Sequence, residues 1–262
     1  MAGGVYTHGH HESVLRSHRW RTVENSAAYL LPHLRPGVRL LDVGCGPGTI
    51  TADFAGRVGR ESVLGVDASA EIIAAAERDH QGVSFATGDV YRLDFPDSSW
   101  DIVHAHQVLQ HLADPIAALK EMRRVVKPGG IVAARDSDYA TKTWYPADAR
   151  LDRWLALYSE IARANGGEPD AGRRLLAWAH AAGFSQVKAS ASAWCFATPD
   201  ERAWWGGLWA DRMTSSAIAE QAVREGRATS GELAAIAAAW RGWADAADGW
   251  LAMTHGEILC TR

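Results

Sequence analysis

The sequence predicts an α/β fold in which a doubly wound, mostly parallel sheet of seven strands carries a helical cap. Two observations predict it. An apolar run over residues 38–43 ends in a glycine cluster, and an apolar stretch with helical spacing over 50–58 follows at once. Beyond it, short apolar runs alternate with longer amphipathic segments, as in a parallel sheet whose strands are joined by helices.

The individual elements follow from the same two patterns. The predicted strands are short apolar or alternating runs, at 38–43, 62–69, 83–90, 100–107, 131–136, 186–197 and 250–260. The predicted helices are segments with helical spacing, at 13–31, 50–58, 70–80, 115–126, 146–165 and 170–182, with two or more alanine-rich helices in 199–248. This last helical segment would separate the final two strands.

The composition excludes several classes of protein. Of the 262 residues, 47% are hydrophobic and 22% are charged, which is ordinary for a soluble globular chain. The net charge of −4 gives no basic surface for nucleic acid, and no apolar run approaches the roughly 20 residues that span a bilayer. The first residues do not resemble a signal peptide, and three widely spaced cysteines suggest neither disulfides nor a zinc site. We therefore expect a reduced, cytoplasmic protein without a nucleic-acid or membrane partner.

The glycine cluster after the first strand has the spacing Gly44-x-Gly46-x-Gly48. A strand, a glycine turn and a helix together direct backbone N–H groups at a ligand, and glycine lets the backbone approach it closely. A dinucleotide fingerprint would need a third glycine where Thr49 stands. Asp42, just before the first glycine, would face an ammonium group better than a pyrophosphate. An ordinary tight turn is the alternative interpretation.

With the segment Asp42–Gly48, the chain resembles the class I S-adenosylmethionine-dependent methyltransferases. Within them it is most similar to the branch of ubiquinone, menaquinone and natural-product methyltransferases. The resemblance covers about residues 38–138 and includes Trp100–Val103, Leu109–Leu112 and Lys127–Gly130. It implies a Rossmann-like methyltransferase fold, in which the glycine segment wraps the methionine half of S-adenosylmethionine.

Two acids after later strands suit the rest of that cofactor. Asp67 lies where a ribose-binding carboxylate follows the glycine loop, although it could instead cap the next helix. In the family, the acidic residue at the position of Asp89 contacts the adenine amino group. The alternative is that Gly88 and Asp89 only form a surface turn. The residues expected to bind the cofactor are Arg21, Asp42, Gly44, Cys45, Gly46, Asp67, Ala68, Gly88, Asp89, Val90, His106 and His111.

The N-terminal segment is rich in histidine but lacks a matching set of carboxylates and cysteines, so we predict no metal site there. In the resembled family the N-terminal helices close the active site, which implies a lid arm over residues 1–35. Arg21 is then a candidate partner for the methionine carboxylate, or else a solvated helix arginine.

The catalytic candidates come from this arm and from the floor of the sheet. We expect Tyr6 to bring its ring face near the sulfonium, with the His10–His11 pair beside it to take a proton. Asp136 and His106, at strand ends, are the alternative polar groups, and a disordered terminus is the alternative to a lid. His111 is assigned mainly to packing and hydrogen bonding.

Ten of the twelve tryptophans lie after residue 140. Most fit a helical core, but some fall in the insertions, where rigid rings could line a pocket for a flat or cationic substrate, or form a dimer interface. These candidates are Trp144, Tyr145, Trp204, Trp205 and Trp209.

Together these features predict methyl transfer from S-adenosylmethionine to a small aromatic or alkaloid-like metabolite of secondary metabolism. The acceptor atom, O, N or C, stays open, as does the choice between monomer and homodimer. A nicotinamide-dependent oxidoreductase and a non-catalytic S-adenosylmethionine-binding protein are the alternatives. The expected organisation is a lid arm over 1–35, a cofactor-binding core over 36–138, and the rest of the sheet over 139–262 with cap insertions near 139–169 and 199–248.

Overall fold

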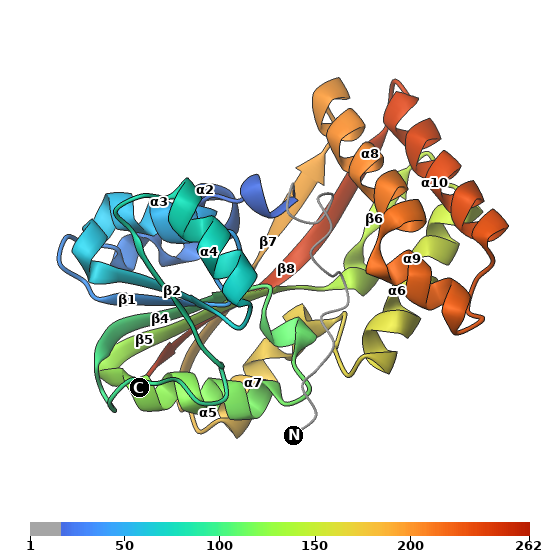
Figure 1. Cartoon of the computed structure of the whole chain (residues 1–262). Coiled ribbons are helices and arrows are strands. Elements are labelled where there is room, and N and C mark those ends of the chain that lie inside the picture. The colour runs from blue at the N-terminus through green and yellow to red at the C-terminus, as the bar shows by residue number, and fades with distance from the viewer. Residues whose placement is uncertain (1–16) are drawn as a thin grey trace.

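One eight-stranded sheet runs through residues 17–262, the part of the chain that the computed structural model describes. The strands are β1 Leu40–Val43, β2 Val63–Asp67, β3 Ser84–Thr87, β4 Trp100–His106, β5 Val126–Ser137, β6 Thr143–Tyr145, β7 Gln186–Phe196 and β8 Trp250–Thr261. Their order is β3–β2–β1–β4–β5–β8–β6, with β7 also paired to β8 (Figure 1). The pairs from β3 to β5 are parallel, whereas β8 runs antiparallel to β5, β6 and β7.

Helices connect the strands and build the cap. The α-helices are α2 Val23–Ser26, α3 Thr49–Val58, α4 Ala70–Asp79, α5 Pro115–Val125, α6 Ala149–Ala164, α7 Leu175–Ala181, α8 Pro199–Ser215, α9 Ala217–Arg224 and α10 Ser230–Asp245. Short 3-10 helices cover Ala28–His33, Arg60–Ser62, Leu109–His111, Tyr139–Thr141 and Ala171–Arg174.

Both faces of the parallel part of the sheet are buried, which explains its continuous apolar strands. Successive side chains of a strand point to opposite faces, so Leu40 joins the core that contains Phe54 of α3. The next residue, Leu41, joins the core that contains Leu119 and Met122 of α5. Figure 1 shows α3 and α4 on one side of the sheet and α5 and α7 on the other.

The cap has a hydrophobic core of its own, formed by α6, α8, α9 and α10 beside the long β7–β8 pair (Figure 1). Its centre is aromatic: the ring of Trp154 packs edge-on against Trp209 and Trp240, with centroids 4.5 and 4.8 Å apart. Such pairs add about 0.5–1.5 kcal/mol each beyond the area that they bury. No helix within residues 17–262 is long and apolar enough to cross a membrane.

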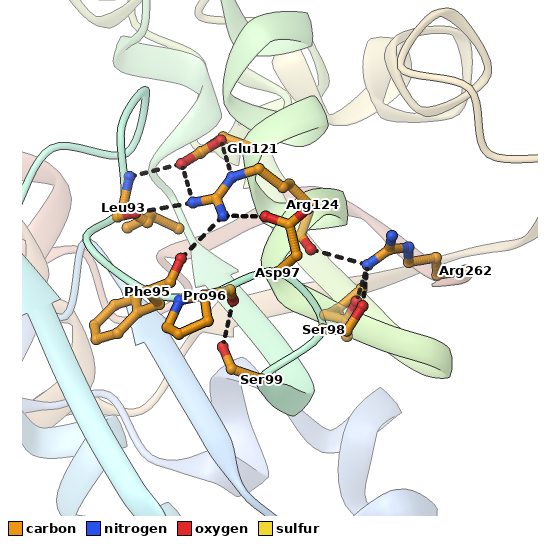
Figure 2. A network of polar contacts seen from close by, with 10 residues as sticks. Leu93, Phe95, Pro96, Asp97, Ser98, Ser99, Glu121, Arg124 and Arg262 are labelled. Carbon is orange, nitrogen blue, oxygen red and sulfur yellow. Dashed lines mark hydrogen bonds and ion pairs between the residues drawn. The ribbon is translucent and has the colours of Figure 1, made fainter.

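A polar network lies at the end of the sheet where β4 begins (Figure 2). Arg124, at the end of α5, donates hydrogen bonds to the carbonyl groups of Leu93 and Phe95 and to the carboxylates of Asp97 and Glu121. The guanidinium thereby fixes the loop that leads into β4. The network lies where β4 begins and holds this loop against α5.

Two features of the predicted fold differ in the structure. The described part of the helix predicted at 13–31 is broken, because Thr22 has an extended backbone (φ −130°) and caps the short helix α2. A 3-10 helix follows over Ala28–His33. The prediction also missed β6, whose three residues pair with the start of β8 and are too few to show a periodic pattern.

Candidate cofactor and substrate site

A cavity of about 540 Å³ lies at the carboxyl ends of β1, β2 and β4. From β1 the sheet continues through β2 and β3 on one side and through β4 and β5 on the other. Open α/β sheets bind ligands at such a switch point. The segment 17–21, Tyr139 and helix α8 supply the other walls. All twelve residues expected at the cofactor line this cavity, namely Arg21, Asp42, Gly44, Cys45, Gly46, Asp67, Ala68, Gly88, Asp89, Val90, His106 and His111.

The glycine loop has a backbone that only glycine adopts readily. Gly44, Gly46 and Gly48 have φ angles of +68°, +54° and +81°. A Cβ at Gly44 would lie 2.3 Å from Cγ2 of Val108, so a larger residue there would also clash. The loop therefore presents bare backbone to the cavity at the start of α3.

Asp67 connects this loop to the end of β2. One carboxylate oxygen accepts a hydrogen bond from the Gly46 N–H at 3.1 Å, and the other accepts one from the Ser69 N–H at 3.0 Å. The α4 helix cap, which was the alternative role for Asp67, is supplied by Ser69, whose Oγ accepts from the Ile72 N–H. Asp67 is thus held rigidly at the cavity wall, with further lone pairs for a ligand.

The buried carboxylate of Asp42 lies beneath the loop. It accepts a hydrogen bond from Thr51 Oγ1 at 2.6 Å and pairs with His104 Nδ1 at 2.8 Å. Burial and the negative charge of Asp42 raise the pKa of the neighbouring Cys45 thiol, which stays protonated. Cys45 is therefore a wall residue and no nucleophile.

Comparisons with known proteins agree with this geometry. A family model described as a methyltransferase domain matches residues 41–134. The chain is 37% identical to an uncharacterised methyltransferase of Schizosaccharomyces pombe over 97% of this chain and 95% of that protein. The chain is a class I S-adenosylmethionine-dependent methyltransferase.

Two further similarities extend along most of the methyltransferase. It is 30% identical to a probable methyltransferase of Aspergillus luteorubrus over 98% of this chain and 97% of that protein. The fold is similar to that of phosphoethanolamine N-methyltransferase 2 of Haemonchus contortus, solved with phosphomonomethylethanolamine and S-adenosylhomocysteine. That match has a TM-score of 0.57 at 18% identity and covers 91% of this chain and 53% of that one.

The described start of the N-terminal segment lies against the cavity of the methyltransferase. Arg21 donates a hydrogen bond from Nη2 to Gln107 Oε1 at 2.6 Å, and Thr49 Oγ1 donates to the His18 carbonyl at 3.1 Å. Arg212 of α8 donates to Ser17 Oγ at 2.7 Å. The segment thus joins the glycine loop, the sheet and the cap. Three catalytic candidates, Tyr6, His10 and His11, lie outside the described residues.

His106 ends β4 and lines the cavity with a buried ring. Within residues 17–262 neither ring nitrogen has a hydrogen-bond partner. Burial, together with the positive charges of Arg21 and Arg135, lowers the pKa of His106 well below its usual value. The imidazole is therefore neutral at physiological pH, and its unprotonated nitrogen can accept a hydrogen bond from a ligand.

The other two polar candidates in the floor have different positions. Asp136 does not line the cavity; it lies beneath it, where one oxygen accepts a hydrogen bond from the Gln110 N–H at 3.1 Å. Burial raises the pKa of Asp136 to about 7. His111 does line the cavity and pairs with the Gln110 amide at 3.0 Å, and burial together with Arg21 lowers its pKa to about 3.

Only part of the predicted aromatic pocket reaches the cavity. Trp205 and Trp209 line it, because residues four apart share one face of α8. Trp204 points elsewhere and packs on Trp20, with ring centroids 5.4 Å apart. Trp144 and Tyr145 lie on β6, away from the cavity. There the ring of Trp144 packs against Trp154, and Tyr145 is 56% exposed. These last three residues are not among those that line the cavity.

Several lining residues were not among the sequence candidates: Gln107, Val108, Ser137, Tyr139, Trp194, Arg212 and Met253. Gln107 is notable because it has a φ of +54°, an uncommon backbone for a residue that is not glycine. Its amide joins Arg21 to His255, whose Nε2 lies 3.0 Å from Gln107 Nε2. Arg212 could have been predicted from the sequence as a lining residue, because it follows the candidate Trp209 by three positions and therefore shares its helix face.

Proposed function

We propose that this methyltransferase transfers the methyl group of S-adenosylmethionine to a small aromatic or alkaloid-like metabolite. One observation carries the proposal: a single cavity joins the glycine loop and the acids of β1–β3 to the Trp205–Trp209 wall of α8. The cofactor would occupy the first part, and a flat acceptor would lie against the second. Sites of this kind are mostly apolar, with a few polar groups that fix orientation.

The residues present fit the cofactor. The glycine loop presents bare backbone in a conformation that only glycine adopts readily, and Asp67 would offer a rigid carboxylate to two ribose hydroxyl groups. Asp89 and the backbone of Val90 would receive the adenine, and Arg21 the methionine carboxylate. When bound, the cofactor supplies an electrophilic methyl group on a positively charged sulfur.

The protein's own part is to orient, to exclude water and, for some acceptors, to take a proton. Holding the acceptor in line can contribute about 7–11 kcal/mol. A phenol must lose its proton as it attacks, whereas a neutral amine need not. His106 is a lining group with an unprotonated ring nitrogen, so it would orient such an acceptor by accepting a hydrogen bond; its lowered pKa makes it a weak base for complete proton transfer.

Turnover with an isotope-labelled methyl donor tests this proposal on a panel of phenols, aromatic amines and indoles. The expected result is a labelled small molecule. Incorporation of label only into RNA, DNA or protein would contradict it. A nicotinamide-dependent reaction is disfavoured by Thr49 at the position of the third glycine. A cytoplasmic location also belongs to the proposal, supported by three cysteines that form no disulfide.

A further inference from the structure

We infer that Gln107 positions the guanidinium of Arg21 for the carboxylate of the cofactor's methionine end. This inference rests on the proposed function, which places Arg21 at that carboxylate, and it adds the residue that holds the arginine there. Arg21 belongs to the N-terminal segment, whereas Gln107 directly follows β4, and both line the cavity. Arg21 Nη2 donates a hydrogen bond to Gln107 Oε1 at 2.6 Å, so this contact joins the segment to the carboxyl end of the sheet.

The backbone of Gln107 is fixed independently of its side chain. Its N–H donates to the carbonyl oxygen of Arg135 at 2.7 Å, and its φ is +54°. A residue with a side chain adopts a positive φ at a cost. Such residues persist where the surrounding structure holds them, and they cluster at functional sites. The end of β4 therefore carries Gln107 in a defined place, from which its amide can orient another side chain.

The amide of Gln107 also has a defined orientation, which His255 of β8 determines. His255 is fully buried, and its Nε2 lies 3.0 Å from Gln107 Nε2. An amide nitrogen only donates, so His255 Nε2 is the acceptor and carries no proton. Burial and nearby positive charges, chiefly that of Arg135, lower the pKa of His255 well below its usual value, which keeps the ring neutral. The amide oxygen is thereby the atom that faces Arg21, as a guanidinium requires.

A neutral amide suits this role better than a carboxylate would. A guanidinium has five N–H donors in a rigid fork that matches the two oxygens of a carboxylate. Gln107 orients this fork through the Nη2 donor and adds no negative charge that would compete with the ligand's carboxylate. Arginine has several rotatable bonds, and holding it in advance reduces the conformational freedom that binding must remove. Gln107 is therefore a positioning residue, which acts on the cofactor through Arg21.

Calorimetry with two matched ligands tests the inference. S-adenosylhomocysteine has an amino-acid end with a carboxylate, whereas methylthioadenosine keeps the adenosine and the sulfur but lacks that end. Gln107→Met should bind S-adenosylhomocysteine about 2- to 10-fold more weakly than wild type, which is the cost of fixing one flexible side chain, and should bind methylthioadenosine as wild type does. Equal losses for the two ligands, a loss for methylthioadenosine alone, or no loss at all would overturn the inference. Failure of the wild-type protein to bind S-adenosylhomocysteine would instead contradict the proposed function.

A double-mutant cycle shows whether Gln107 acts through Arg21. Arg21→Met should lower the affinity for S-adenosylhomocysteine about 10- to 100-fold, as expected for a lost hydrogen bond between charged groups. Adding Gln107→Met to this variant should cause no further loss, because the arginine that it positions is gone. A further loss of the same size as in wild type would overturn the inference. Wild-type affinity in Arg21→Met would also overturn it, while binding of S-adenosylhomocysteine would leave the proposed function intact.

A second substitution covers the case in which Gln107→Met does not fold. Gln107→Asn keeps an amide and suits a positive φ, but its side chain is one methylene shorter and should not maintain the contacts to Arg21 and His255 together. It should weaken the binding of S-adenosylhomocysteine alone, and wild-type affinity for that ligand would overturn the inference. Gln186→Met is the matched control. It replaces an exposed glutamine at the first residue of β7 and should leave both affinities unchanged.

Discussion

At the scale of single residues, hydrogen bonds within the protein hold two of the carboxylates that line the cavity in place. Asp67 accepts hydrogen bonds from two backbone N–H groups, and Asp42 is paired with His104 and Thr51. Each carboxylate is therefore fixed before a ligand arrives, which reduces the entropy that binding must remove. The same arrangement means that substituting either acid changes both the loop and the ligand site.

Asp67 provides the first prediction. Asp67→Ala should weaken binding of S-adenosylmethionine by about 1.5–3 kcal/mol, because two ribose hydroxyl groups would lose a charged acceptor. Asp67→Asn keeps one oxygen and the shape, and should lose less. Calorimetry measures both affinities, and a urea melt of each variant shows whether the loop survives. Wild-type affinity in the folded alanine variant would end the ribose assignment.

Asp136 provides a prediction about pH. Because burial raises the pKa of Asp136 from 3.8 to about 7, the folded state retains its proton at pH values where the unfolded state has lost it. Its ionisation therefore destabilises the fold as the pH rises through this window. Asp136→Asn keeps the oxygen that accepts from Gln110 and should be more stable than wild type at pH 8, by at most about 4 kcal/mol.

The stability advantage of the asparagine variant should shrink as the pH falls from 7 towards 3.8, because Asp136 is protonated in both states only below that value. Urea unfolding at pH 8 and pH 4.5 measures it, and the histidines contribute equally to both proteins. The exposed Asp152→Asn should show the same small difference at both pH values. A variant that is less stable than wild type at pH 8 would contradict the burial effect.

At the scale of elements, local patterns predicted β1 to β5 and their helices well because each combines a periodic apolar stretch with a clear boundary. Gly48 precedes α3, Ser69 caps α4, and Asp114 with Pro115 starts α5. The N-terminal helix was predicted wrongly because its apolar spacing continues across Thr22, whose extended backbone no periodicity reveals. Trp204 shows the corresponding limit at the site: composition placed it in the pocket, but its direction depends on how α8 packs.

The glycine loop provides the prediction at this scale. Gly44→Ala should destabilise the fold and weaken cofactor binding, because a Cβ would meet Val108 at 2.3 Å and the residue has a φ of +68°. Gly242→Ala is the control, since this glycine lies inside α10 with no atom within 4 Å of an added Cβ. That change should raise stability by up to about 1 kcal/mol. Two similar stability changes in thermal or urea unfolding would contradict the special role of the loop.

At the scale of the whole molecule, three parts meet at one cavity: the sheet, the cap with its own aromatic core, and the N-terminal segment. The distribution of charged residues around this cavity was not predictable from the sequence, because only the fold brings Arg21, Asp42 and Arg212 to line the same cavity. The cofactor end was predictable, since its residues cluster around strand ends. The acceptor end was not, because it combines α8 with residues of β4, β7 and β8.

The lid arm remains a prediction at this scale. Residues 17–21 contact the glycine loop, the sheet and the cap, which is the observation that supports this prediction. Deleting residues 1–11 should lower turnover a hundredfold or more while the fold survives, because water would enter and the Tyr6 and His10–His11 groups would be lost. Unchanged turnover would show that the arm is a tail and that any base comes from the floor.

A crystal structure with bound S-adenosylhomocysteine tests the central claim most directly, namely that one cavity divides into a cofactor end and an acceptor end. It should place the ribose within hydrogen-bond distance of Asp67 and the adenine beside Asp89, with the space between His106, Trp209 and Arg212 still open for an acceptor. A cofactor bound against Trp209 and Arg212, or outside the cavity, would contradict the claim.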